Sequence, residues 1–96
     1  MSVTDARSAA AFATDRAWRL NPQVALRDES FGALAYHYGN RRLVFLKSRT
    51  LVTLVAALAA YPTAGDALAE LVPDAERRAY ERALARLAAA EVIDAR

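Results

Sequence analysis

The chain contains no cysteine, one histidine (His37) and three glycines among its 96 residues. The lack of cysteine excludes disulfides, zinc–thiolate sites, iron–sulfur clusters and cysteine nucleophiles. His37 has no second histidine beside it and no carboxylates at helical ligand spacing, so the sequence offers no metal site. The scattered glycines form no phosphate-binding loop. We therefore expect a protein that is not an enzyme and that takes no cofactor.

Long hydrophobic runs are also missing. The longest, residues 51–61, is interrupted by Thr53, and a membrane-spanning helix needs about 20 apolar residues. The first residues lack the charged start and apolar stretch of a signal peptide. A small domain without cysteine is typical of a reducing compartment. We expect a cytoplasmic protein that does not enter a membrane.

The net charge is only +2, so any electrostatic preference must come from local clusters of charge. The length allows one domain. Residues 1–16 are rich in small and polar residues, which favours a flexible N-terminal arm, although a short helix packed on the domain or on a partner is an alternative. We expect the single folded domain to occupy residues 17–96 and to begin around Trp18.

Two apolar runs flank Gly39-Asn40, which is a strong signal for a β-hairpin. We expect strands over residues 24–27, 33–38 and 43–46. A two-residue loop fixes the register of the hairpin, so that the numbers of paired residues sum to 79. The expected pairs are Leu34 with Phe45, Ala35 with Val44, Tyr36 with Leu43, His37 with Arg42, and Tyr38 with Arg41.

This register divides the hairpin into two faces, because side chains alternate across a sheet. The bulkier face is expected to lie on the core and carries Leu34, Tyr36, Leu43 and Phe45. The other face is smaller and more polar and carries Ala33, Ala35, His37, Arg42, Val44 and Leu46. The third strand is thus apolar on both faces, which means that it is covered on both sides or is available to a ligand.

Three helices are expected after the strands. Ser48 is a good N-cap for a helix whose apolar positions follow the helical period, and Thr63 with Asp66 forms a capping-box variant for the next. Pro73-Asp74 interrupts the chain before a third helix over residues 75–90. The expected fold class is α+β, with a three-stranded antiparallel sheet followed by three helices in a winged-helix-like layout.

Positive charge gathers in two places. Arg41, Arg42, Lys47 and Arg49 have no acid between them, and the last helix carries four more arginines diluted by Glu76 and Glu81. Both sets could be ordinary solvated faces. However, if the strands lie in sequence order, the third strand is an edge strand with unpaired backbone groups. An edge bracketed by cations favours an added strand from an acidic peptide.

The stretch from Trp18 to Ser48, WRLNPQVALRDESFGALAYHYGNRRLVFLKS, is similar to the mycofactocin biosynthesis peptide chaperones. These belong to a wider family of recognition domains for ribosomally made precursor peptides, which includes the pyrroloquinoline quinone biosynthesis chaperone. The segments FGALAYH and RRLVFLKSRT are the most specific, and the order of elements continues to about Val92. The resemblance implies that the leader of a precursor peptide is added beside the third strand, in a groove walled by the third helix. It also implies presentation of that peptide to a radical S-adenosylmethionine enzyme.

Carried onto this chain, the resemblance implies main-chain pairing along residues 43–46, with side-chain contacts from Val44 and Leu46. It places Arg42 and Lys47 at the ends of the groove. The implied peptide-binding residues are Arg42, Leu43, Val44, Phe45, Leu46 and Lys47, with Arg77, Arg78, Glu81, Arg82 and Arg86 from the third helix. Tyr80 and Leu84 are assigned to the core. A departure from the family is a third helix rich in arginine, with alanine at many wall positions.

Two other functions stay open. A winged helix could bind DNA through the arginines of its last helix, although acids interrupt that helix and asparagine and glutamine are missing from it. The edge strand could alternatively pair with a second copy of the chain. We expect a monomer or weak dimer that binds no nucleic acid. Replacing Val44 by proline is expected to abolish peptide binding, because proline removes a backbone donor.

Overall fold

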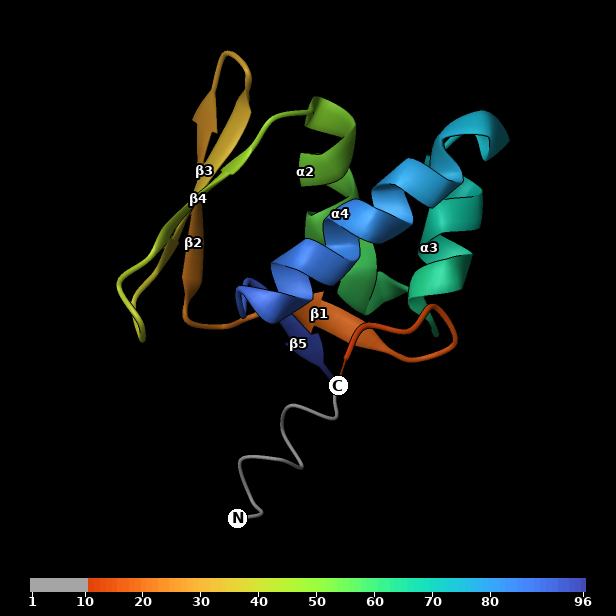
Figure 1. Ribbon diagram of the computed structural model, residues 1–96, viewed down its shortest axis with the longest axis horizontal. Helices are drawn as coiled ribbons and strands as arrows, with labels where there is room; N and C mark the ends of the chain where they lie inside the picture. Colours follow the sequence, from red (N-terminus) through yellow and green to blue (C-terminus); the bar gives the residue numbers. More distant parts are fainter. Residues whose placement is uncertain (1–10) are drawn as a thin grey trace.

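The computed structural model describes residues 11–96. It contains two small sheets and three α-helices, which confirms the α+β class (Figure 1). The strands are β1 (Trp18–Leu20), β2 (Val24–Glu29), β3 (Gly32–His37), β4 (Leu43–Leu46) and β5 (Ile93–Ala95). The helices are α2 (Arg49–Ala57), α3 (Ala64–Leu71) and α4 (Arg77–Ala89), with 3₁₀ turns η1 (Leu58–Ala60) and η2 (Asp74–Glu76).

The larger sheet is antiparallel and has the order β2-β3-β4. Leu34 pairs with Phe45 and Ala35 with Val44, so the predicted register is confirmed. In Figure 1 this sheet is seen nearly edge-on, and the three helices lie on one side of it. A second sheet, in which β1 pairs with β5, was not predicted. Its strands have only three residues each, too few to produce a visible alternation.

The β3–β4 loop is longer than predicted. The His37 amide donates to the Arg42 carbonyl at 2.9 Å, and the Arg41 amide donates to the His37 carbonyl at 2.7 Å. Arg41 takes a φ of 63°, the left-handed conformation that often closes a longer loop. Residues 38–41 therefore form a four-residue loop, and the predicted pairing of Tyr38 with Arg41 is wrong. The register is unchanged because the predicted two-residue loop and the observed four-residue loop have the same midpoint, between Gly39 and Asn40.

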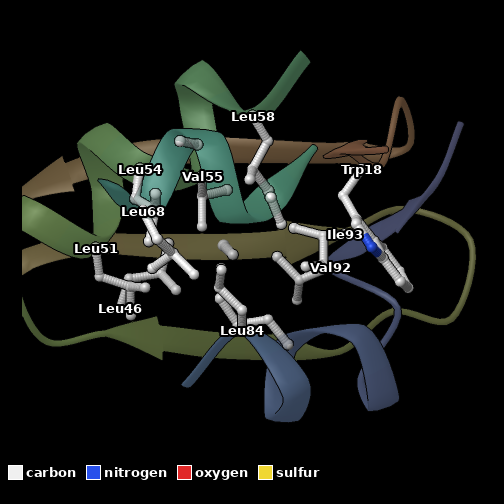
Figure 2. Close-up of a cluster of buried hydrophobic side chains, with 14 of the residues drawn as sticks. Trp18, Leu46, Leu51, Leu54, Val55, Leu58, Leu68, Leu84, Val92 and Ile93 are labelled. Atoms are coloured by element: carbon white, nitrogen blue, oxygen red, sulfur yellow. The ribbon is translucent and has the colours of Figure 1, made fainter. Parts of the chain in front are cut away.

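The prediction of which sheet face lies on the core is also wrong. Ala33, Ala35 and Leu46 are fully buried, whereas Leu43 and Phe45 are 58% and 59% exposed. Figure 2 shows Leu46 inside the core, close to Leu51. The reason is steric: small side chains on the inner face allow the helices to approach the sheet closely, so the bulky side chains are left outside.

Both predicted helix caps are confirmed. The Ser48 hydroxyl accepts from the Leu51 amide at 3.1 Å at the start of α2, and the Thr63 hydroxyl accepts from the Asp66 amide at the start of α3. Pro73 precedes the 3₁₀ turn that leads into α4. The helices bury leucine and valine against the inner face of the sheet, and this single cluster forms the core. None of the helices within residues 11–96 is long and apolar enough to cross a membrane.

Most of the expected N-terminal arm, residues 1–10, lies outside the described residues. Phe12 packs on Trp18 with 5.2 Å between the ring centroids, and the Trp18 indole donates to the Ala13 carbonyl at 3.0 Å. The Gly65 amide donates to the Thr14 carbonyl at 2.8 Å. Residues 12–14 are thus held against α3 and the core.

Candidate functional site: a cleft beside the edge strand

A cleft of about 490 Å³ lies between the end of β4 and one face of α4. Apolar side chains from strand and helices form much of its wall, and two cations lie among them. The lining residues are Phe45, Lys47, Ser48, Leu51, Ala79, Tyr80, Ala83 and Arg86. A hollow of this composition, beside the last strand of the sheet, suits an extended peptide better than a small polar metabolite.

A short, fixed junction sets the distance between the two walls. Leu46 is buried, and only Lys47 and Ser48 separate it from α2. The Ser48 hydroxyl, besides capping α2, lies 2.7 Å from the Tyr80 hydroxyl of α4. This hydrogen bond ties the strand–helix junction to the opposite wall. The abrupt change from strand to helix therefore builds the cleft and holds its width.

Alanine on the helical wall keeps the cleft open. Ala79 and Ala83 lie one turn apart on α4 and both line the hollow, with Arg86 following at the next turn. The i, i+4, i+7 spacing puts these three positions on one face of the helix. Methyl side chains there leave room for a ligand side chain between helix and strand. Ala79 and Ala83 thus contribute to the cleft through the space that they leave.

The outer edge of β4 has no neighbouring strand within the described residues. In an antiparallel pair, hydrogen-bonded and non-hydrogen-bonded residue pairs alternate. His37 and Arg42 form a hydrogen-bonded pair. Val44 and Leu46 lie two and four residues after Arg42, so their backbone groups also face β3. Those of Leu43 and Phe45 face outward. Proline at Val44 would therefore break the sheet itself, and Phe45 is the position at which to test strand addition.

The charge of the cleft is positive. Lys47 on the strand side and Arg86 on the helix side line it, and its lining residues include no acid. The Arg49 guanidinium is instead directed toward the β2–β3 turn, where it lies 3.5 Å from the Glu29 carbonyl. Two cations facing one apolar hollow favour a ligand with both apolar and carboxylate side chains.

Only some of the residues implied by the resemblance line the cleft. Phe45 and Lys47 line the cleft, and of the five helix residues only Arg86 does. Arg42 and Leu43 are exposed at the start of β4, and Val44 is half-buried. The buried Leu46 side chain packs in the core, so the expected contact of this side chain with a ligand is wrong.

The other helix residues lie away from the cleft lining. Arg78, Glu81 and Arg82 are exposed. Arg77 is bound within the fold: its guanidinium donates to the Val72 and Ala69 carbonyls, each at 3.0 Å, and to the Asp74 carboxylate at 2.9 Å. Arg77 thus closes the α3–α4 connection. Its position in the amphipathic pattern gave no sign of this structural role.

Five lining residues were not among the predicted site residues: Ser48, Leu51, Ala79, Tyr80 and Ala83. Tyr80 was assigned to the core, and it does pack against the core while its hydroxyl faces Ser48. The available signal was the spacing of Ala79, Ala83 and Arg86 along one helical face. The charge pattern predicts a role for the arginines, whereas the small residues shape the hollow.

His37 has a structural role in the β3–β4 hairpin. Its ring is buried, and Nδ1 accepts hydrogen bonds from the Gly39 and Asn40 amides at 3.0 and 3.1 Å. These bonds fasten the β3–β4 loop to the sheet. No group of three or more potential metal-ligating side chains occurs in the part of the chain that the structure describes.

Comparison with known proteins gives one consistent result. The model of the peptide chaperone MftB family matches residues 17–94. The peptide chaperone MftB of Mycobacterium ulcerans is 47% identical over 89 residues, covering 92% of this chain and 82% of the relative. That of Mycobacterium tuberculosis is 47% identical, covering 85% and 76%, and that of Mycolicibacterium smegmatis is 51% identical, covering 76% and 72%. No solved structure matches the chain significantly.

Proposed function

The chain belongs to the peptide chaperone MftB family, and on that premise we propose that it is a non-catalytic escort for a ribosomally made precursor peptide. The leader of the peptide pairs as an added strand with the outer edge of β4, and its side chains enter the cleft beside α4. The chaperone then presents the peptide to a radical S-adenosylmethionine enzyme of mycofactocin biosynthesis in the cytoplasm. The observation that carries the proposal is the apolar, cation-lined cleft along the outer edge of β4, which no other strand within residues 11–96 occupies.

The backbone supports strand addition at two positions. Leu43 and Phe45 direct their amide and carbonyl groups away from β3, so each can exchange hydrogen bonds with one residue of a peptide strand. The edge is short, which limits the register in which a peptide can pair. Arg41, Arg42 and Lys47 flank it and disfavour pairing with a second copy, because the same cations would meet one another.

The cleft supports a specific side-chain pattern in the ligand. Successive residues of an added strand point to opposite faces of the sheet. Those that point toward the helices enter the hollow over Leu51, Ala79 and Ala83, which favours an apolar side chain. Lys47 and Arg86 at the walls favour a neighbouring carboxylate. We therefore expect a leader segment in which an apolar residue is followed or preceded by an acid.

The strength of binding follows from these contacts. A few main-chain hydrogen bonds contribute roughly 0.5–1.5 kcal/mol each, and one or two buried apolar side chains contribute about 1.5–3 kcal/mol each. The ordering of a flexible peptide costs roughly 2–5 kcal/mol. When the favourable contributions lie near the upper end of these ranges, the balance corresponds to a dissociation constant of about micromolar, which allows both capture and release.

The test is a titration of the protein with a labelled synthetic leader of the precursor peptide, followed by fluorescence anisotropy. Arg86→Glu is compared with Arg82→Glu, because both are exposed arginines of α4 but only Arg86 lines the cleft. We expect Arg86→Glu to weaken binding by about tenfold, since it replaces an attraction with a repulsion, and Arg82→Glu to change it less than about twofold. Equal effects of the two variants would contradict binding in the cleft.

The same titration separates peptide binding from DNA binding. Contacts to phosphates make affinity fall steeply with salt, whereas strand addition depends on salt only through the few cations beside the edge and the cleft, such as Arg42, Lys47 and Arg86. We expect a shallow salt dependence for the peptide and no shift of random duplex DNA at moderate salt. Tight, salt-sensitive binding of duplex DNA would instead support the winged-helix function.

A further inference from the structure

The outer face of the β2-β3-β4 sheet carries an unusual amount of exposed apolar surface. Leu43 and Phe45 on β4 are joined by Phe31 in the β2–β3 turn, which is 42% exposed, and by Tyr38, which is 62% exposed. Leu34 and Tyr36 of β3 lie between them and are half-buried. We name these six residues the outer patch. Among the described residues no helix covers this face (Figure 1).

Exposing these apolar side chains to water is unfavourable for folding. The sheet places alanines on its buried face and its largest apolar residues on the exposed face, the reverse of what burial alone favours. The aromatic side chains are also ordered against one another. Phe31 meets Phe45 edge-to-face at 5.8 Å, and Tyr36 meets Tyr38 edge-to-face at 5.0 Å. Contiguous, pre-ordered apolar surface of this kind marks a binding surface on a soluble protein.

We propose that the outer patch is the surface onto which the peptide-modifying enzyme docks, through an apolar area rimmed by carboxylates. The occupant follows first from continuity. Phe45 belongs both to the outer patch and to the lining of the cleft, so a protein seated on the patch lies against the strand to which the peptide is added. A docked enzyme is thereby placed where the peptide leaves the cleft. This inference rests on the proposed function for the identity of the partner.

Charge around the patch indicates the chemistry of the partner surface. Arg41 precedes and Lys47 follows the two exposed β4 side chains, and both cations are exposed. Glu29 on this face is paired with Arg27 at 3.0 Å. The rim along β4 is thus positive and complementary to an acidic partner surface. A second copy of this chain would bring the same cations together, which disfavours self-association through the patch.

The size of the patch suits a transient complex. Six residues along β3 and two strands across, β3 and β4, give a face of roughly 20 by 10 Å. That is smaller than one side of a standard stable interface, which is about 800 Å². The patch alone therefore supports weak docking, and the bound peptide would extend the interface. An enzyme that must release each chaperone after one peptide requires this kind of reversible contact.

The experiment uses Phe31→Glu and Leu34→Glu, since neither residue lies on β4 or lines the cleft. Ala56→Glu is the matched control, an added carboxylate at an exposed position of α2. Binding of each purified variant to the purified radical S-adenosylmethionine enzyme is measured by biolayer interferometry, with and without precursor peptide. We expect both patch variants to weaken enzyme binding at least tenfold and to leave peptide affinity within twofold of the parent. The control is expected to change neither.

Three other outcomes overturn the inference, and a fourth separates it from the proposed function. Enzyme binding that is unchanged in both patch variants removes the outer patch as the docking surface, whether or not the peptide binds in the cleft. A dimer in sedimentation that the patch variants dissociate assigns the patch to a second copy. Flotation with anionic vesicles that the patch variants abolish assigns it to a membrane surface. If the parent binds enzyme but no peptide, the proposed function fails while the docking surface is still tested.

Discussion

Proline at position 45 tests strand addition most directly, because the Phe45 amide faces away from β3 and donates to no other strand in the described residues. Phe45→Pro removes this one donor and should leave the sheet intact, since proline is tolerated at an edge position whose amide faces solvent. The substitution also removes an exposed ring. Phe45→Ala removes the ring and keeps the amide, so the ratio of the two affinities isolates the backbone hydrogen bond.

The expected magnitude follows from what the peptide loses. Its carbonyl forfeits a hydrogen bond and is left without a partner against the strand, at a cost of about 1–3 kcal/mol. Since 1.4 kcal/mol corresponds to a tenfold change, Phe45→Pro should bind the precursor peptide about 5- to 140-fold more weakly than Phe45→Ala. Anisotropy of a labelled peptide measures this ratio. Urea unfolding followed by the fluorescence of Trp18, which is the single tryptophan and is buried, checks that both variants are folded.

Val44→Pro supplies the opposite control. The Val44 amide faces β3, so its loss should lower the midpoint of unfolding markedly. Equal peptide affinities for Phe45→Pro and Phe45→Ala, with both proteins folded, would show that the outward amide of β4 is not used. The proposed mode of binding would then be wrong, even if the cleft itself binds the peptide.

Three further substitutions test the framework of the site. Gly32→Ala should destabilise the fold by about 1–3 kcal/mol in urea unfolding, because Gly32 has a φ of 149° and an added methyl group would collide with the Leu46 carbonyl. Ser48→Ala removes both the helix cap and the bond to Tyr80; it should cost about 0.5–2 kcal/mol of stability in urea unfolding and also weaken peptide binding in the anisotropy titration. Arg77→Met should lower the thermal midpoint through loss of its bonds to two carbonyls and leave peptide affinity unchanged, since Arg77 does not line the cleft. A selective loss of binding in Arg77→Met would contradict the structural role assigned to it.

The register and the caps could be predicted from the sequence because they depend on local chemistry. Gly39-Asn40 marks the centre of the loop, and the pairing of Leu34 with Phe45 follows from that centre whether the loop has two residues or four. Ser48 and Thr63 cap their helices through their own hydroxyl groups. Such features need no knowledge of what packs on the sheet.

The orientation of the sheet could not be predicted in this way. Bulk suggested that Leu43 and Phe45 lie inward, but the close approach of the helices requires Ala33 and Ala35 at the interface. The role of Arg77 was hidden for a related reason. Its partners are backbone carbonyls of another helix and its connection, and the composition of α4 carries no information about them. The cleft could not be predicted for the same reason, because small residues such as Ala79 contribute through the space that they leave between helix and strand.

The pairing of β1 with β5 has a consequence for the biosynthesis of the protein. The Arg19 side chain bonds to Asp94, 75 positions later, and Trp18 pairs with Ala95. Loop closure over such a distance is entropically expensive and is repaid only when the intervening core has formed. On the ribosome, the buried side chains of Trp18 and Ile93 thus cannot come together until the last turn of α4 has emerged. A nascent chain should remain incompletely packed around Trp18 until residues 93–95 have left the exit tunnel.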